Sequence, residues 1–206
     1  MDQILDFDAF EQDFRDACVE GIRFLSRNYN QAPFYAVCIY MDGFDGCFGL
    51  YANREEDFVR TLQNYRSKYP ECYGTVMQVK ELRYSSGDWE FQSVGLPGLD
   101  LPDDFECVSV RMEGWSRKVH ALSYEQEAFT EMHYQLFEEV ACRIALSTEL
   151  ARELTTLQKS DDFLITVSGH DEPSLASIYR PMWYSEKGSL DGFDAYAYSV
   201  EHPESE

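Results

Sequence analysis

Residues 34–51 read FYAVCIYMDGFDGCFGLY, and this stretch decides the fold. It begins with an unbroken apolar run, Phe34–Met41, whose length is typical of a strand that is buried on both faces. The segment Asp42–Gly46 has the composition of a turn, and the chain then returns through a second run, Cys47–Tyr51. We therefore predict a β-hairpin whose first strand is buried.

Helical periodicity flanks this hairpin on both sides. Before it, apolar residues spaced three and four apart predict a helix over residues 8–28. After it, the Asn53 side chain can cap a second helix, with Glu56 three positions later, and Pro70 ends that helix. The apolar stripe of the first helix consists of Phe10, Phe14, Cys18, Ile22 and Leu25.

The middle of the chain is predicted to hold two strands and a loop. The strands cover residues 76–84 and 89–93, and the turn Ser85–Asp88 joins them. Residues 96–104 contain two prolines and one glycine, so they are not expected to form regular structure. We predict a loop that carries three acids.

The C-terminal half is predicted to be helical around one further strand. Ser123 and Gln126 form a capping-box pair that begins a long helical region, and Ser147-Thr148 breaks it into two helices. The apolar run Phe163–Ser168 predicts a strand that Gly169 ends. Short aromatic segments follow, around Ile178–Tyr184 and Asp194–Val200.

This order of elements predicts an α+β fold with a single layer of strands. The sheet is expected to be mostly antiparallel or mixed, with three or four helices packed on it. Residues 1–200 are predicted to form one domain, because no segment has the composition of a linker, and residues 201–206 an acidic frayed tail.

The charge of the chain narrows the class of partner. The sequence has 38 Asp and Glu against 17 Lys and Arg, a net charge of −21, together with 15% aromatic residues, which disfavours disorder. Such a charge repels nucleic acid and anionic membrane surfaces, and it attracts a basic protein. The other interpretation is that the charge serves only solubility.

No metal site, cofactor motif or disulfide framework is expected. The six cysteines form no C-x-x-C pair and the four histidines are scattered. Asp-Gly-Phe-Asp occurs at 42–45 and 191–194, but neither copy has the spacing of a calcium loop, so both predict turns. Reduced core cysteines, an N-terminus unlike a signal peptide and the lack of a long apolar stretch predict a cytoplasmic protein.

The triplet His170-Asp171-Glu172 is the one candidate for catalysis, because it follows the predicted strand 163–168. His170 could act as a general acid or base beside a carboxylate. Gly169 and Pro173 bracket the triplet as in a polar turn, and no nucleophile or phosphate-binding loop accompanies it. We therefore assign no catalytic residue, and an enzyme that uses His170 and nearby carboxylates remains the alternative.

The segment Leu82–Phe91 reads LRYSSGDWEF and resembles the signature of a bacterial family, domain of unknown function 4303. Ser85, Asp88 and Trp89 match that signature, whereas Tyr84 stands where the family has Trp and Phe91 where it has Tyr. With the element order, the resemblance covers about residues 7–185. It implies proteins associated with toxin neighbourhoods and immunity repertoires, and it implies no catalytic residue.

Within the segment, Trp89 and Tyr84 are interpreted as core aromatics, with exposed interface aromatics as the alternative. Asp88 is expected to cap the turn through nearby amides.

Together these features predict an acidic binding protein, an immunity protein that neutralises a basic, nuclease-type toxin by covering its active site. A structural or adaptor subunit is a further alternative. The expected contact surface is the loop from Asp100 to Glu106, with the hairpin tip and a late acidic pair as further candidates. The binding residues predicted in this way are Asp42, Asp45, Asp100, Asp103, Asp104, Glu106, Asp161 and Asp162.

Overall fold

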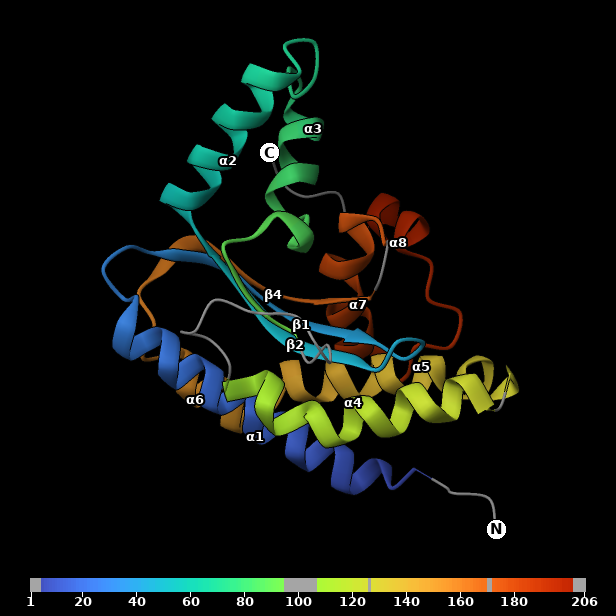
Figure 1. Cartoon of the computed structure of the whole chain (residues 1–206). Helices are drawn as coiled ribbons and strands as arrows, with labels where there is room; N and C mark the ends of the chain where they lie inside the picture. The colour runs from blue at the N-terminus through green and yellow to red at the C-terminus, as the bar shows by residue number, and fades with distance from the viewer. Residues whose placement is uncertain (1–4, 95–106, 126, 170–171, 202–206) are drawn as a thin grey trace.

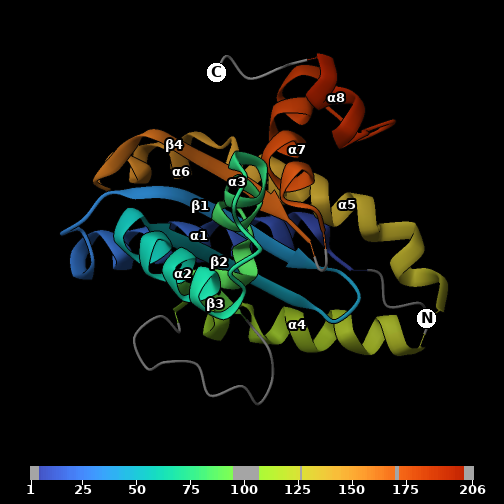
Figure 2. The same ribbon diagram turned by 90° about the horizontal axis from the view of Figure 1, so that it is seen from above.

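A computed structural model describes residues 5–94, 107–125, 127–169 and 172–201. These residues form one four-stranded sheet with helices on both faces (Figures 1 and 2). In chain order the elements are α1 (Phe7–Asn28), β1 (Phe34–Asp42), β2 (Cys47–Arg54), α2 (Glu55–Lys68), α3 (Val76–Arg83), the 3-10 turn η1 (Ser86–Asp88), β3 (Phe91–Val94), α4 (Cys107–Glu125), α5 (Glu127–Ala145), α6 (Thr148–Leu154), β4 (Lys159–Ser168), α7 (Ser174–Lys187) and α8 (Ala195–Glu201).

The sheet is mixed, with strand order β3-β2-β1-β4. β2 runs antiparallel to both β1 and β3, whereas β4 pairs with β1 in parallel, Tyr40 opposite Ser168. The predicted α+β class is therefore confirmed. The described residues contain eight α-helices, so the prediction of three or four was too low.

Two hydrophobic clusters, one on each face of the sheet, explain the unbroken apolar run of β1. Val37, Ile39 and Met41 belong to the cluster beneath α1, α4, α5 and α6. Tyr35 and Cys38 belong to the cluster beneath α2, α3, α7 and α8. Since both faces are covered, the residues of β1 from Phe34 to Met41 are all apolar instead of alternating with polar ones.

Several predicted elements are confirmed. α1 begins at Phe7 and the hairpin pairs as expected, with Asp42 opposite Cys47. Gly46, in the hairpin turn, has a φ of 69°, and a Cβ there would lie 2.4 Å from the Ser116 carbonyl oxygen, so only glycine fits. Ser147 caps α6 by accepting from the Leu150 amide, which divides the helical region as predicted.

The predicted strand at residues 76–84 was wrong, because this segment is helix α3. Thr75 and Gln78 form a capping box: the Thr75 hydroxyl accepts from the Gln78 amide, and the Gln78 side chain accepts from the Thr75 amide. The apolar residues Val79 and Leu82 are three positions apart and pack against the same cluster, which is a helical spacing.

The predicted cap at Asn53 was also wrong. β2 continues through Arg54, and Arg54 occupies the N-cap of α2 without a side-chain cap. Asn53 is buried, and its amide donates to the Tyr35 hydroxyl at 3.0 Å. A short polar side chain before a helix was thus recruited by a buried neighbour instead of by the helix amides.

The predicted helix start at Ser123–Gln126 was wrong as well, because Ser123 lies within α4. Its hydroxyl donates to the carbonyl oxygens of Gly43 and Val119. No helix was predicted over α4, although its apolar residues recur at spacings of three and four. The two aromatic segments near the C-terminus are helices α7 and α8. The buried residues of this α4 stripe are Val108, Met112, Val119 and Leu122. Within the described ranges, no helix combines the length and the apolarity needed to cross a membrane.

Candidate functional site

The carboxyl ends of the parallel strands β1 and β4 lie side by side, since Tyr40 is opposite Ser168. After β4 the chain passes through Gly169 and Glu172 and enters α7 at Ser174. In open α/β sheets, ligands bind outside the carboxyl ends of the parallel strands, and β1 and β4 present such an end here. Figure 2 shows this end of the sheet beneath α3 and the start of α7.

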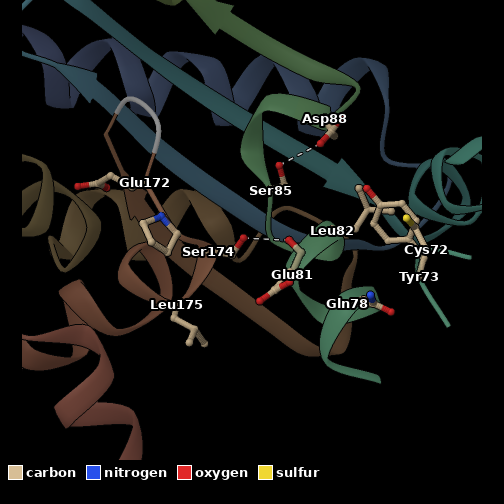
Figure 3. A pocket seen from close by; sticks show the side chains of 11 residues that line it. Cys72, Tyr73, Gln78, Glu81, Leu82, Ser85, Asp88, Glu172, Ser174 and Leu175 are labelled. Atoms are coloured by element: carbon tan, nitrogen blue, oxygen red, sulfur yellow. Dashed lines mark hydrogen bonds between the residues drawn. The ribbon is translucent and has the colours of Figure 1, made fainter. Parts of the chain in front are cut away.

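An outer pocket of about 460 Å³ lies between α3, η1 and the start of α7. Figure 3 shows Asp88 and Ser85 on one side of it, joined by a hydrogen bond of 3.0 Å. On the other side, the Ser174 hydroxyl donates to the Glu81 carbonyl oxygen at 2.9 Å and so holds α7 against α3. The outer pocket is lined by Cys72, Tyr73, Gln78, Glu81, Leu82, Ser85, Asp88, Glu172, Pro173, Ser174 and Leu175.

A second, more enclosed inner pocket of about 330 Å³ adjoins the outer one, and both share Ser85, Glu172 and Ser174. We call these two pockets together the groove. The remaining residues of the inner pocket are Tyr40, Tyr51, Tyr84, Ser86, Gly87, Ser168, Gly169 and Ser177.

The groove is acidic and rich in hydroxyl groups. Its described lining residues include three carboxylates, those of Glu81, Asp88 and Glu172, and no Lys or Arg. Asp88 accepts hydrogen bonds from the hydroxyls of Ser85 and Tyr65 (2.5 Å), whereas Glu81 is exposed at the rim. Such a lining favours a cationic group and disfavours an anion.

The inner pocket is lined by the phenol groups of Tyr40 and Tyr51, which are neutral. Tyr51 is 5% exposed and stacks on Tyr40, with 4.9 Å between ring centroids and 9° between ring planes. Burial raises the pKa of both phenols well above the ordinary range of tyrosine, and Asp42 raises that of Tyr40 further. Both rings therefore stay uncharged throughout the physiological range.

A buried charge cluster lies behind the groove wall and connects α5, the end of β4 and α7. The Arg180 side chain is only 4% exposed; its Nη1 donates to the Val167 carbonyl oxygen (2.7 Å) and to Glu172 (2.8 Å). Its Nη2 lies 2.9 Å from Glu138. Glu172 also accepts from the Gly169 amide at 2.7 Å, which fixes the turn that enters α7. The cluster therefore holds Glu172 at the groove wall.

Glu138 is the carboxyl group with the most perturbed ionisation in this cluster. Burial raises its pKa to about 7, with Arg180 opposing the rise and Glu172 and Glu139 adding to it. Tyr134 and Cys142 also interact with Glu138, and burial raises the pKa of both. At neutral pH a substantial fraction of Glu138 is therefore protonated.

Glu138→Gln is expected to alter the pH dependence of stability. The folded pKa of about 7 exceeds the usual 4.5, so between these values the folded state binds more protons than the unfolded state. Raising the pH through this window therefore removes stability, by about 1–3 kcal/mol, and glutamine does not titrate. Thermal unfolding should show the variant gaining stability relative to the native protein between about pH 5 and pH 8. The exposed Glu113→Gln should show no such gain, and an equal change in both variants would contradict the expectation.

The segment that resembles the family signature supplies one wall of the groove. Trp89 is 4% exposed, and its Nε1 donates to the Arg83 carbonyl oxygen at 3.0 Å. The Tyr35 hydroxyl donates to the same oxygen at 2.6 Å, and Tyr84 is buried beside them. The interpretation of Trp89 and Tyr84 as core residues is therefore confirmed. Asp88 accepts from hydroxyls, whereas amides had been expected.

The structure does not gather the described acids among the predicted binding residues into one surface. Asp42 is 3% exposed, and its carboxylate accepts from the amides of Phe44 and Asp45 within the hairpin turn, so it is a turn cap. Asp45 is exposed at the hairpin tip. Asp161 and Asp162 are exposed near the start of β4, at the opposite end of the parallel pair, and Asp162 pairs with Arg83.

Other predicted residues lie outside the described residues. These are Asp100, Asp103, Asp104, Glu106 and His170. The groove residues Glu81 and Tyr51 had not been singled out from the sequence, because isolated acids and aromatics in helices and strands carry no signal there. Among the described residues, no group of three His, Cys, Asp or Glu side chains is arranged to hold a metal ion.

The fold and the groove define an α+β protein with a mixed sheet and an acidic cavity at the carboxyl ends of its parallel strands. The chain belongs to the family described as Domain of unknown function (DUF4303), whose model matches residues 15–178. This confirms the resemblance found at Leu82–Phe91, and the matched range contains every residue that lines the groove. No curated protein and no solved structure gives a significant match to the chain.

Proposed function

We propose that this protein is a cytoplasmic binding protein for a basic protein partner, and that it acts as an immunity protein against a nuclease-type toxin. The observation that carries the proposal is the groove: three carboxylates line it and no described Lys or Arg does. A net charge of −21 adds a long-range field that draws a basic partner toward it.

The mechanism is occlusion. A nuclease must present Lys and Arg side chains to bind phosphates. Those side chains enter the acidic groove, where carboxylates replace the phosphates, and the body of the immunity protein covers the active site. The mixture of aromatic rings and carboxylates in the groove suits such a contact, because interface hot spots combine aromatic anchors with charged groups.

Salt-dependent binding to the product of the neighbouring gene tests this function. We expect tight binding at low salt that weakens as the ionic strength rises, because exposed charges are screened. Glu81→Arg reverses an exposed charge at the groove rim and should weaken binding by about tenfold to a hundredfold. It should also lessen the protection of a nuclease substrate.

Glu125→Arg provides the matched control. It makes the same charge change at an exposed position at the end of α4, on the other face of the sheet, and should change the affinity by less than about twofold. Absence of binding at low salt, or equal losses in the two variants, would refute the proposal.

A further inference from the structure

The inner pocket is lined by a hydroxyl group that makes no hydrogen bond to the described residues. Tyr51 is 5% exposed and lines this pocket, and its hydroxyl makes no hydrogen bond with any residue that the structure describes. The Tyr51 oxygen is not among the fully buried polar atoms without a partner, so it faces the open space of the pocket. The Tyr51 hydroxyl is therefore a group that a ligand in this pocket can reach and bond.

The surroundings of Tyr51 set the charge of that ligand. Glu172 forms part of the wall that the inner and outer pockets share, and it pairs with Arg180 in the cluster behind that wall. Glu81 and Asp88 line the outer approach. A cation approaching Tyr51 thus meets carboxylates along its path, whereas an anion would be repelled.

The shape and the hydrogen-bonding groups favour a guanidinium over an ammonium. The rings of Tyr40 and Tyr51 stack on each other, and a planar guanidinium can stack on the outer face of such a pair. The hydroxyls of Ser168 and Ser177 donate to backbone carbonyl oxygens, which leaves their own oxygens able to accept. Several acceptors spread over one pocket match the five N–H donors of arginine better than a compact ammonium.

Elsewhere in this chain, an arginine already contacts a tyrosine ring and a carboxylate at the same time. The Arg83 guanidinium lies 4.0 Å from the centroid of the Tyr35 ring and pairs with Glu55. In the groove, Leu82 and Leu175 of the outer pocket offer apolar contact to the methylene stem of an incoming side chain.

We infer that the inner pocket binds one arginine side chain, delivered through the outer pocket by an extended segment of a basic protein partner, with the guanidinium bonded to Tyr51. This inference rests on the proposed function for the source of the arginine. It assigns a ligand class to a pocket of about 330 Å³, a size ordinary for small-ligand sites.

The test uses short glycine-serine peptides that carry one central arginine, lysine or citrulline, titrated into the whole protein and followed by the NMR signals of the tyrosine rings. The arginine peptide should bind and shift the Tyr40 and Tyr51 signals. Citrulline has the same shape without the charge and should bind at least about tenfold more weakly, and lysine several-fold more weakly.

Tyr51→Phe separates ligand binding from a structural role. The variant keeps the ring and its stacking, so the arginine peptide should bind about fivefold to tenfold more weakly, as expected for one lost hydrogen bond. Because the native hydroxyl makes no hydrogen bond to the described residues, the thermal stability of the free variant should be unchanged or higher. The control Tyr196→Phe removes a hydroxyl from an exposed ring on α8 and should change neither measurement.

Equal binding of arginine and citrulline peptides, no binding of either, or an unchanged affinity in Tyr51→Phe would overturn the inference. These experiments distinguish failure of the arginine pocket from failure of the proposed immunity function. If the arginine peptide binds as expected and the neighbouring gene product does not, the arginine pocket stands and the immunity role falls. If the gene product binds with the dependence on Glu81 and the peptides do not, only the arginine pocket falls.

Discussion

Replacing Arg180 by methionine is expected to lower the free energy of unfolding by about 3–5 kcal/mol, because two buried carboxylates would lose their shared cation. The side chains of Glu138 and Glu172 are only 12% and 16% exposed, so water cannot fully compensate either charge. The Val167 carbonyl oxygen would also lose a donor. Urea unfolding at about pH 8 measures the loss.

The same variant should recover part of its stability at about pH 5, because a carboxyl that has lost its cation binds a proton more readily. Burial already raises the pKa of Glu138 to about 7 with Arg180 present, so this group takes up the proton. Arg117→Met is the control: Arg117 is 65% exposed and pairs with Glu113 on the surface of α4, so its loss should cost less than about 0.5 kcal/mol. A comparable small loss in Arg180→Met would show that the cluster contributes little to the fold.

Trp89→Ala is expected to destabilise the protein by about 3–5 kcal/mol, the range for removing a large aromatic side chain from a core. Trp89 meets the Tyr35 ring edge-on, with 5.9 Å between centroids, and donates to the Arg83 carbonyl oxygen. Trp89→Phe retains an aromatic ring and loses that hydrogen bond and part of the volume, so it should cost about 1–2 kcal/mol. Denaturant unfolding gives both values.

An interface role for Trp89 makes the opposite prediction, namely near-native stability with weaker partner binding. Tyr124→Ala gives the comparison for an exposed aromatic: this ring is 77% exposed on α4, and its removal should change stability by less than about 0.5 kcal/mol. If Trp89→Ala proved as mild as Tyr124→Ala, the motif would not anchor the core that supports the groove.

The sequence predicted those parts of the fold whose local pattern and tertiary environment agree. The continuous run of β1 and the helical stripe of α1 each bury a face that periodicity alone identifies. α3 was mispredicted as a strand because Val76–Arg83 is short, and its apolar spacing fits both periods until the Thr75 capping box is recognised. Asn53 was assigned to a cap that Tyr35 outcompetes, and Tyr35 is far from it in sequence.

Parts of the candidate site could also be found from the sequence, whereas others could not. The Ser85–Asp88 turn and the segment after β4 both stood out in the sequence, and they form facing walls of the groove. Their meeting depends on the parallel pairing of β1 with β4, which no local pattern encodes. Tyr51 lies in the β2 strand of the predicted hairpin, and only the packing around it shows that it lines the inner pocket.

The sequence by itself determined the fold class, the central hairpin, the family and the acidic character of the protein. All of these follow from composition, short motifs or periodicity along one segment. The tertiary structure alone decided which helices cover each face of the sheet, that Asp42 is a buried turn cap, and that Glu81, Asp88, Glu172 and Tyr51 line two adjoining pockets. The physical reason is that burial and charge pairing depend on contacts between segments distant in the chain, and a local pattern carries no record of them.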